Sequence, residues 1–189
     1  IADGASAGSL TKTGAGTLSL LGAAAYTGPT TIAEGTLRIG DGGTTGSLPQ
    51  AIVNHGTLEL DRSDDVEYAG TLSGEGAFHK LGSNGLHLTG DSSAFTGTST
   101  IDGGTLRLDG ALGGTLQLAS GVVVTGNGKA GSASFASGSE LSPGGSGAIG
   151  ALGFSGDLTM AAGSLYTVDA SNTGQGDSVT VGGKATLQG

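Results

Sequence analysis

Three histidines are the side chains in this sequence best suited to catalysis or metal binding. They are His55, His79 and His87. Imidazole acts as a general base in nucleophilic triads and as a ligand for zinc. The histidines lack the His-x-x-x-His spacing of a zinc site, and no Gly-x-Ser-x-Gly nucleophile elbow lies between a strand and a helix. We interpret them as surface residues at strand ends, and we predict no catalytic residue and no cofactor.

An acidic cluster lies between two of the predicted strands. It consists of Asp61, Asp64, Asp65 and Glu67. Hard cations such as Ca²⁺ bind several carboxylate oxygens, so the cluster is a candidate calcium site. It lacks the glycine-aspartate nonapeptide rhythm of calcium-binding β-rolls. We therefore interpret it as a solvated turn and predict no metal site, and calcium binding by this loop stays an open alternative.

Two further patterns could belong to a ligand-binding or glycan-active surface. Enzymes that cleave polysaccharides use paired carboxylates in a cleft, usually with aromatic platforms for sugar rings, but the sequence has no tryptophan and 4% aromatic residues. Tyr26 and Phe95 take equivalent positions in the repeat described below, so their expected role is stacking within the fold. The threonine-rich stretches 30–31 and 98–100 resemble an ice-binding array. Such an array needs outward threonines on every coil, and the strand preference of threonine explains these two stretches.

The composition fits many short strands joined by tight turns. Glycine accounts for 41 of the 189 residues, but the mean hydropathy of +0.10 is too apolar for a disordered chain. The net charge is −9 with only seven Lys and Arg residues, which argues against nucleic-acid binding because that needs clustered cations. The sequence contains no cysteine for disulfides. Sustained helical spacing of apolar residues is missing, as is an apolar run long enough for a membrane-spanning helix.

A five-residue unit, Gly-Thr-Leu-polar-aliphatic, recurs along the chain and predicts its elements. Its copies are 16–20, 35–39, 56–60, 104–108 and 114–118. Successive side chains of a strand point to opposite faces, so both aliphatic residues of a unit point the same way. A strand this short buries its apolar face only if copies stack above and below it. The residues predicted to form internal ladders are Leu18, Leu20, Leu37, Ile39, Leu58, Leu60, Leu106 and Leu108.

The units belong to a longer repeat. The stretch 12–39 recurs as 80–108, and the second copy carries a single inserted residue in a loop. The first three units begin at Gly16, Gly35 and Gly56, and a period of roughly twenty residues suits one coil of a β-solenoid with two or three strands per coil. A sandwich or barrel is the competing arrangement. Shared unit sequences and glycine at every corner favour the solenoid, and eight or nine coils are expected.

These residues resemble the autotransporter-associated β-strand repeat. The likeness lies in 12–20, 26–32 and 34–39, with a second copy in 80–108, where Phe95 replaces the tyrosine. The stretch 163–187 resembles the end of such passengers, which often assists folding just before the membrane translocator. The resemblance implies a right-handed parallel β-helix. It also implies secretion through a C-terminal outer-membrane β-barrel and display on a Gram-negative cell surface.

The sequence thus predicts an all-β, right-handed parallel β-helix in two regions. Residues 1–120 are expected to hold the repeat-bearing coils, and 121–189 a continuing, folding-assisting region truncated before the barrel. The expected role is a non-catalytic stalk or adhesin segment at the cell surface. Its expected partners are a host-cell or matrix receptor, or other passengers. The alternatives are a β-helical polysaccharide-active enzyme and a self-association module.

Overall fold

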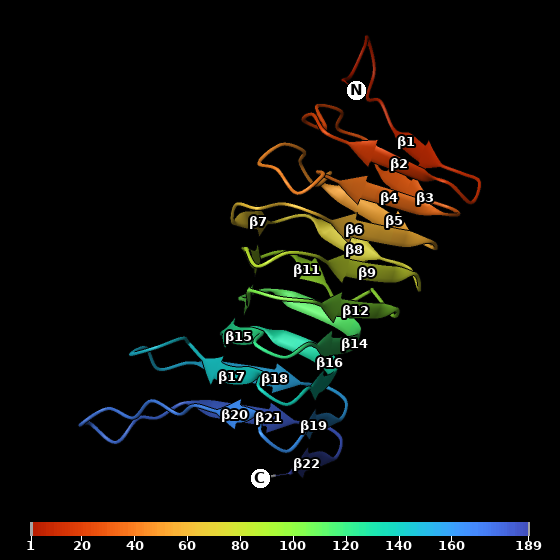
Figure 1. Ribbon diagram of the computed structural model, residues 1–189. Helices are drawn as coiled ribbons and strands as arrows, with labels where there is room; N and C mark the ends of the chain where they lie inside the picture. The colour runs from red at the N-terminus through yellow and green to blue at the C-terminus, as the bar shows by residue number, and fades with distance from the viewer. Residues whose placement is uncertain (1, 189) are drawn as a thin grey trace.

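The recurring units form short parallel strands that stack along one axis (Figure 1). The computed structural model describes residues 2–188. In it Thr17–Leu20 (β2) pairs with Thr36–Ile39 (β4), and β4 pairs with Thr57–Leu60 (β6), each in the register of the sequence units. All pairings between the named strands are parallel. A parallel β-solenoid is therefore confirmed, and the antiparallel sheets of a sandwich are excluded for the described residues.

Each coil has up to three sides, which we number in chain order. The first side carries β1 (Leu10–Lys12), β3 (Thr30–Ile32), β5 (Ala51–Asn54), β8 (Thr71–Ser73), β11 (Asp91–Ser92), β18 (Ala151–Phe154) and β21 (Ser178–Val181). The second side carries β2, β4, β6, β9 (Ala77–Lys80), β12 (Thr98–Ile101), β19 (Leu158–Met160) and β22 (Ala185–Leu187). The third side carries β7 (Val66–Tyr68), β10 (Gly85–Leu88), β13 (Thr105–Leu108), β15 (Val123–Gly126), β17 (Glu140–Pro143) and β20 (Leu165–Tyr166).

Two long strands join the first and second sides around a bend. They are β14 (Ala111–Leu118) and β16 (Lys129–Phe135), and their mutual register shifts between Leu112 and Thr115. The first part of each strand continues the first side, and the second part continues the second side. The bend is thus a corner of the coil, and the hydrogen bonds to neighbouring strands continue on both sides of it.

The coils are not all of one length. Thr17, Thr36 and Thr57 are register partners on successive coils, which confirms the predicted period of roughly twenty residues. The last coil, which leads from Leu158 to its partner Ala185, is longer than the coil from Thr36 to Thr57. The regular winding makes about seven turns, and the strands of the first two rungs, β1 to β4, occupy two sides only. The expected number of eight or nine coils is reached only if those two rungs are included.

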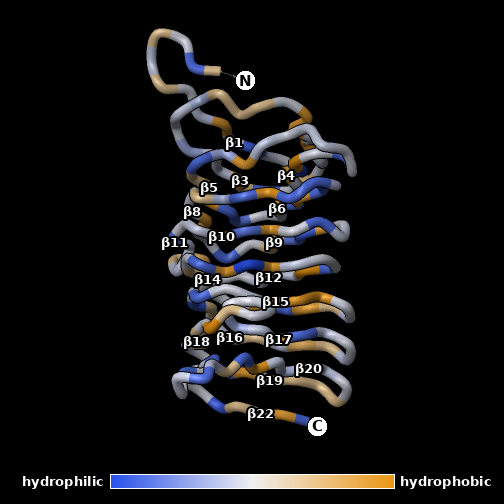
Figure 2. The backbone as a smooth tube through the Cα atoms, turned by 90° about the vertical axis from the view of Figure 1, so that its left-hand side faces the viewer, coloured by the Kyte–Doolittle hydropathy of each residue, from blue (hydrophilic) through white to orange (hydrophobic). Residues whose placement is uncertain are grey.

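Aliphatic ladders fill the interior, as the alternating pattern predicted. Figure 2 shows hydrophobic and hydrophilic residues alternating along the coils. Six of the eight predicted ladder residues are almost fully buried: they are Leu37, Ile39, Leu58, Leu60, Leu106 and Leu108. Leu18 and Leu20 are only partly buried, because β2 pairs with a neighbouring strand on one side only. The inward assignment is confirmed, and burial is weaker in the first rung.

The described residues form strands and turns. Among residues 2–188, no helix is long and apolar enough to cross a membrane.

Candidate functional site

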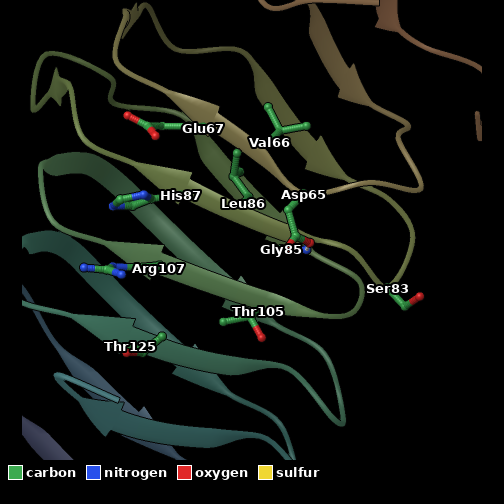
Figure 3. A pocket seen from close by; sticks show the side chains of 10 residues that line it. All are labelled: Asp65, Val66, Glu67, Ser83, Gly85, Leu86, His87, Thr105, Arg107 and Thr125. Carbon is green, nitrogen blue, oxygen red and sulfur yellow. Dashed lines mark hydrogen bonds between the residues drawn. The ribbon is translucent and has the colours of Figure 1, made fainter. Parts of the chain in front are cut away.

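A depression of the surface lies on the outer face of the third side (Figure 3). It has a volume of about 580 Å³ and spans β7, β10, β13 and β15. Its lining residues are Asp65, Val66, Glu67, Ser83, Gly85, Leu86, His87, Thr105, Arg107 and Thr125. The parallel register aligns one outward residue from each strand, so residues from four coils share one surface.

A column of polar side chains crosses this depression. The register places Glu67 beside His87, His87 beside Arg107, and Arg107 beside Thr125. Figure 3 shows Glu67, His87 and Arg107 projecting from three successive strands. Gly85 has no side chain, so the face is hollow beside His87. The result is a shallow site with an acidic end and a basic end.

Asp109, just after β13, contacts both His87 and Arg107 of the column. Its Oδ2 accepts a hydrogen bond from Arg107 Nε at 2.7 Å and lies 2.8 Å from His87 Nε2. Its Oδ1 accepts the backbone N–H of Asn127 at 3.0 Å. Burial alone would raise the pKa of Asp109, but the hydrogen bonds from His87, Arg107 and Asn127 outweigh it and lower that pKa. Asp109 therefore stays ionised and fixes the orientation of both neighbours.

The arrangement is suited to binding polar groups. The Arg107 side chain is 56% exposed, and its hydrogen bond to Asp109 uses Nε, which leaves the terminal nitrogens facing solvent. A guanidinium presented this way binds carboxylates or hydroxyl groups. Among the hydrogen bonds of residues 2–188, none joins a serine or threonine hydroxyl to His87. The His87–Asp109 pair thus lacks the nucleophile of a triad in the described residues.

The three histidines do not come together. His55 lies near Glu75, with 2.9 Å between Nδ1 and Oε1, and both side chains are exposed. His79 lies on the second side between Glu59 and Thr100 in the register. His87 lies on the third side. The two histidines that have acidic partners take them from neighbouring coils, which the spacing of the sequence alone did not indicate.

The three aspartates of 61–67 have separate partners. Asp61 forms an ion pair with Arg38, and both oxygens of Asp64 accept hydrogen bonds from Arg62, at 2.7 and 2.8 Å. Asp65 accepts the backbone N–H of Gly85 at 2.6 Å. The hydrogen bond from Arg62 lowers the pKa of Asp64. Across residues 2–188, no three or more His, Cys, Asp or Glu side chains are grouped to hold a metal ion.

The aromatic and threonine patterns turn out differently from each other. Tyr26 and Phe95 are both buried, consistent with a structural role. Thr30, in one of the two threonine-rich stretches, also points inward and is buried. Thr31 and Thr98 of these stretches point outward, beside Thr11 and Thr115 in the register. The threonines of three Gly-Thr-Leu units also form an outward column, since Thr17, Thr36 and Thr57 are neighbours on the second side. This column was not predicted from the sequence, although the threonine of each unit was its signal.

Comparison with known proteins gives two matches of different extent. A family model described as the passenger-associated-transport-repeat matches residues 10–39 and 78–108, and these ranges contain the two copies, 12–39 and 80–108, recognised in the sequence. The adhesin BmaC autotransporter of Brucella suis biovar 1 (strain 1330) is 40% identical over 133 residues. That alignment covers 59% of this chain and 4% of the adhesin, so the chain corresponds to a small part of its relative. No solved structure matches.

Proposed function

We propose that this chain, which carries two passenger-associated-transport-repeats and is homologous to part of an autotransporter adhesin, is a non-catalytic stalk and adhesin segment of a surface-displayed bacterial passenger. The observation that carries the proposal is the coincidence of each repeat with two stacked rungs of one continuous solenoid. A stack of parallel coils held by an aliphatic core is stiff along its axis. It presents its outward columns at fixed positions.

The wider arrangement follows from the same proposal. The full-length chain carries a C-terminal outer-membrane β-barrel, and the passenger reaches the cell surface through the periplasm. The coils wind in a right-handed sense, as parallel crossover connections nearly always do. Residues 1–120 form the repeat-bearing coils. Residues 121–189 assist folding, because coils that stack one after another need an ordered end on which to start.

Adhesion would use the depression on the third side. Its partner is a host-cell or matrix receptor with polar, hydrogen-bonding groups, since the column offers both an exposed guanidinium and carboxylates. Binding of the full chain to cell layers, matrix proteins and a glycan panel would test this. Replacing Arg107 by Ala should weaken saturable binding about tenfold or more, the loss expected for a charged hydrogen bond.

A matched variant separates loss of the site from general damage. Arg38, on the second side, is also an outward arginine paired with an aspartate, and R38A should bind like the parent chain. If the parent chain shows no saturable binding to any target, or if R38A and R107A are weakened equally, the adhesive role of the depression is wrong.

Two alternative functions predict different results with the same purified chain. A polysaccharide-active enzyme would release new sugar ends, and Asp109→Asn would abolish that release while the fold was retained. A self-association module would show a sedimentation coefficient that rises with protein concentration. The proposed stalk and adhesin segment predicts neither behaviour.

A further inference from the structure

The two repeats occupy different corners of the coil. In the first repeat, β1 and β3 lie on the first side while β2 and β4 lie on the second. In the second repeat, β9 and β12 lie on the second side while β10 and β13 lie on the third. The same repeat sequence therefore forms two stacked rungs, each made of a strand, a corner and a second strand, at either of two corners of the coil. The second repeat thus starts one side further around the coil than the first.

A lysine makes the same contacts at both corners. Lys12 Nζ donates to the carbonyl oxygens of Gly14 at 2.6 Å and Glu34 at 3.1 Å. Lys80 Nζ donates to those of Gly82 at 3.0 Å and Gly103 at 2.8 Å. In each pair, the first carbonyl belongs to the lysine's own corner and the second to the same corner of the next coil. These lysines and their carbonyl partners occupy equivalent repeat positions.

Both lysines point into the protein. The exposed fraction is 0% for Lys80 and 7% for Lys12, although lysine is almost never fully buried unless it is paired. Desolvation lowers the pKa of Lys80, while the charges of Asp65 and Asp102 oppose that shift. The hydrogen-bond partners of both ammonium groups are backbone carbonyls, which would otherwise be left without donors inside the corner.

Glycines give these corners their shape. Gly14 and Gly82 have φ values of +72° and +75°, and Gly35 and Gly104, at the corner of the next coil, have +69° and +76°. This left-handed backbone is open to glycine at little cost. It turns the corner carbonyls inward, where one ammonium group reaches both coils. In the rung that follows the first repeat, buried Asn54 lies at the corner between the first and second sides. It acts similarly, since its Nδ2 donates to the carbonyl of Ala77 at 2.7 Å.

We propose that each passenger-associated-transport-repeat is a corner clamp, in which the lysine locks the carbonyls of its own corner to those of the next coil. The clamp belongs to the corner and not to a particular side, which is why one repeat serves at two places of the cross-section. In a chain that adds coils stepwise, such a clamp fixes the register of each new coil on the previous one. This role is independent of the adhesive role of the third side.

The test compares Lys80→Met and Lys12→Met in the full chain with Lys129→Met, an exposed lysine. Methionine keeps an unbranched side chain as far as the ε position and removes the ammonium group. K80M should lower the thermal midpoint of unfolding. It should also speed amide exchange about tenfold at its own corner, in segments 81–85 and 102–105, because one or two net hydrogen bonds are lost there. K12M should do the same only at segments 13–17 and 33–36. K129M should change neither measurement.

Three results would overturn the clamp. The first is a K80M variant that is as stable as K129M, which would show that the corner accepts an apolar chain equally well. The second is faster exchange spread evenly over both corners in K80M. The third is unchanged amide exchange at 13–17 and 33–36 in K12M. This variant also decides the question if K80M does not fold, because Lys12 lies in the first rung.

Discussion

At the residue scale, one position along a strand separates the solenoid's interior from the depression on its third side. Leu106 is fully buried between Leu86 and Val124 of the neighbouring coils, while Arg107 projects into the depression of the third side. Asp109 then connects Arg107 to His87 on the preceding coil. A substitution on the inner column therefore reports on folding, and one on the outer column reports on the proposed ligand contact.

Leu106→Asp should destabilise the chain by roughly 3–5 kcal/mol, the cost of a buried charge without a partner. Denaturant unfolding would measure this free energy. The control is Thr105→Asp, which places the same group one residue earlier on the outward side and should cost less than about 1 kcal/mol. Equal effects of the two variants would contradict the inward assignment of Leu106.

Acid should destabilise the fold through the hydrogen-bonded carboxylates. The pKa of Asp109 is lowered in the folded chain because its hydrogen bonds outweigh burial. The contribution of Asp109 to the free energy of unfolding is therefore fully present above the pKa of about 4 that an aspartate has in an unfolded chain. This contribution is lost as the pH falls through the lower pKa of Asp109 in the folded chain. Unfolding measured between pH 7 and pH 2 should show this loss. In Asp109→Asn the loss below pH 4 should be smaller, and an unchanged acid profile would contradict the role of Asp109.

At the element scale, the strands were predictable and their placement around the axis was not. The Gly-Thr-Leu units predicted β2, β4, β6, β13 and the end of β14, because alternation and glycine corners are local properties of the sequence. The side on which each repeat lies depends on the summed length of all preceding coils. The His87–Arg107–Asp109 group was missed for the same reason, since His87 meets Arg107 and Asp109 only through the register of neighbouring coils.

Two corner glycines give a matched pair for testing how closely neighbouring coils approach each other at a corner. Gly104 has a φ of +76°, and an added Cβ would collide with the carbonyl oxygen of Asn84 on the preceding coil. Gly121 has a φ of +80°, but no atom lies within 4 Å of an added Cβ. Gly121→Ala should cost about 1–2 kcal/mol from backbone strain alone, and Gly104→Ala clearly more. Equal unfolding midpoints would show that the coils do not approach each other closely at this corner.

At the scale of the whole molecule, the rungs succeed one another along one axis (Figure 1). An outward column on the second side records that order: Ser19, Arg38, Glu59, His79, Thr100, Gln117, Ser134, Thr159 and Thr186 are successive neighbours in the register. The proposed stalk, the depression of the third side and the proposed corner clamps all require this single linear order of coils.

Distances between spin labels along that column test the order most directly. With one label at Ser19 and the other at Thr100, Ser134 or Thr186, the labels stand four, six and eight rungs apart. Parallel strands lie about 4.8 Å apart, so pulsed electron paramagnetic resonance should give distances of roughly 19, 29 and 38 Å, rising linearly. Distances that stay level or fall from Ser134 to Thr186 would contradict the stacked solenoid.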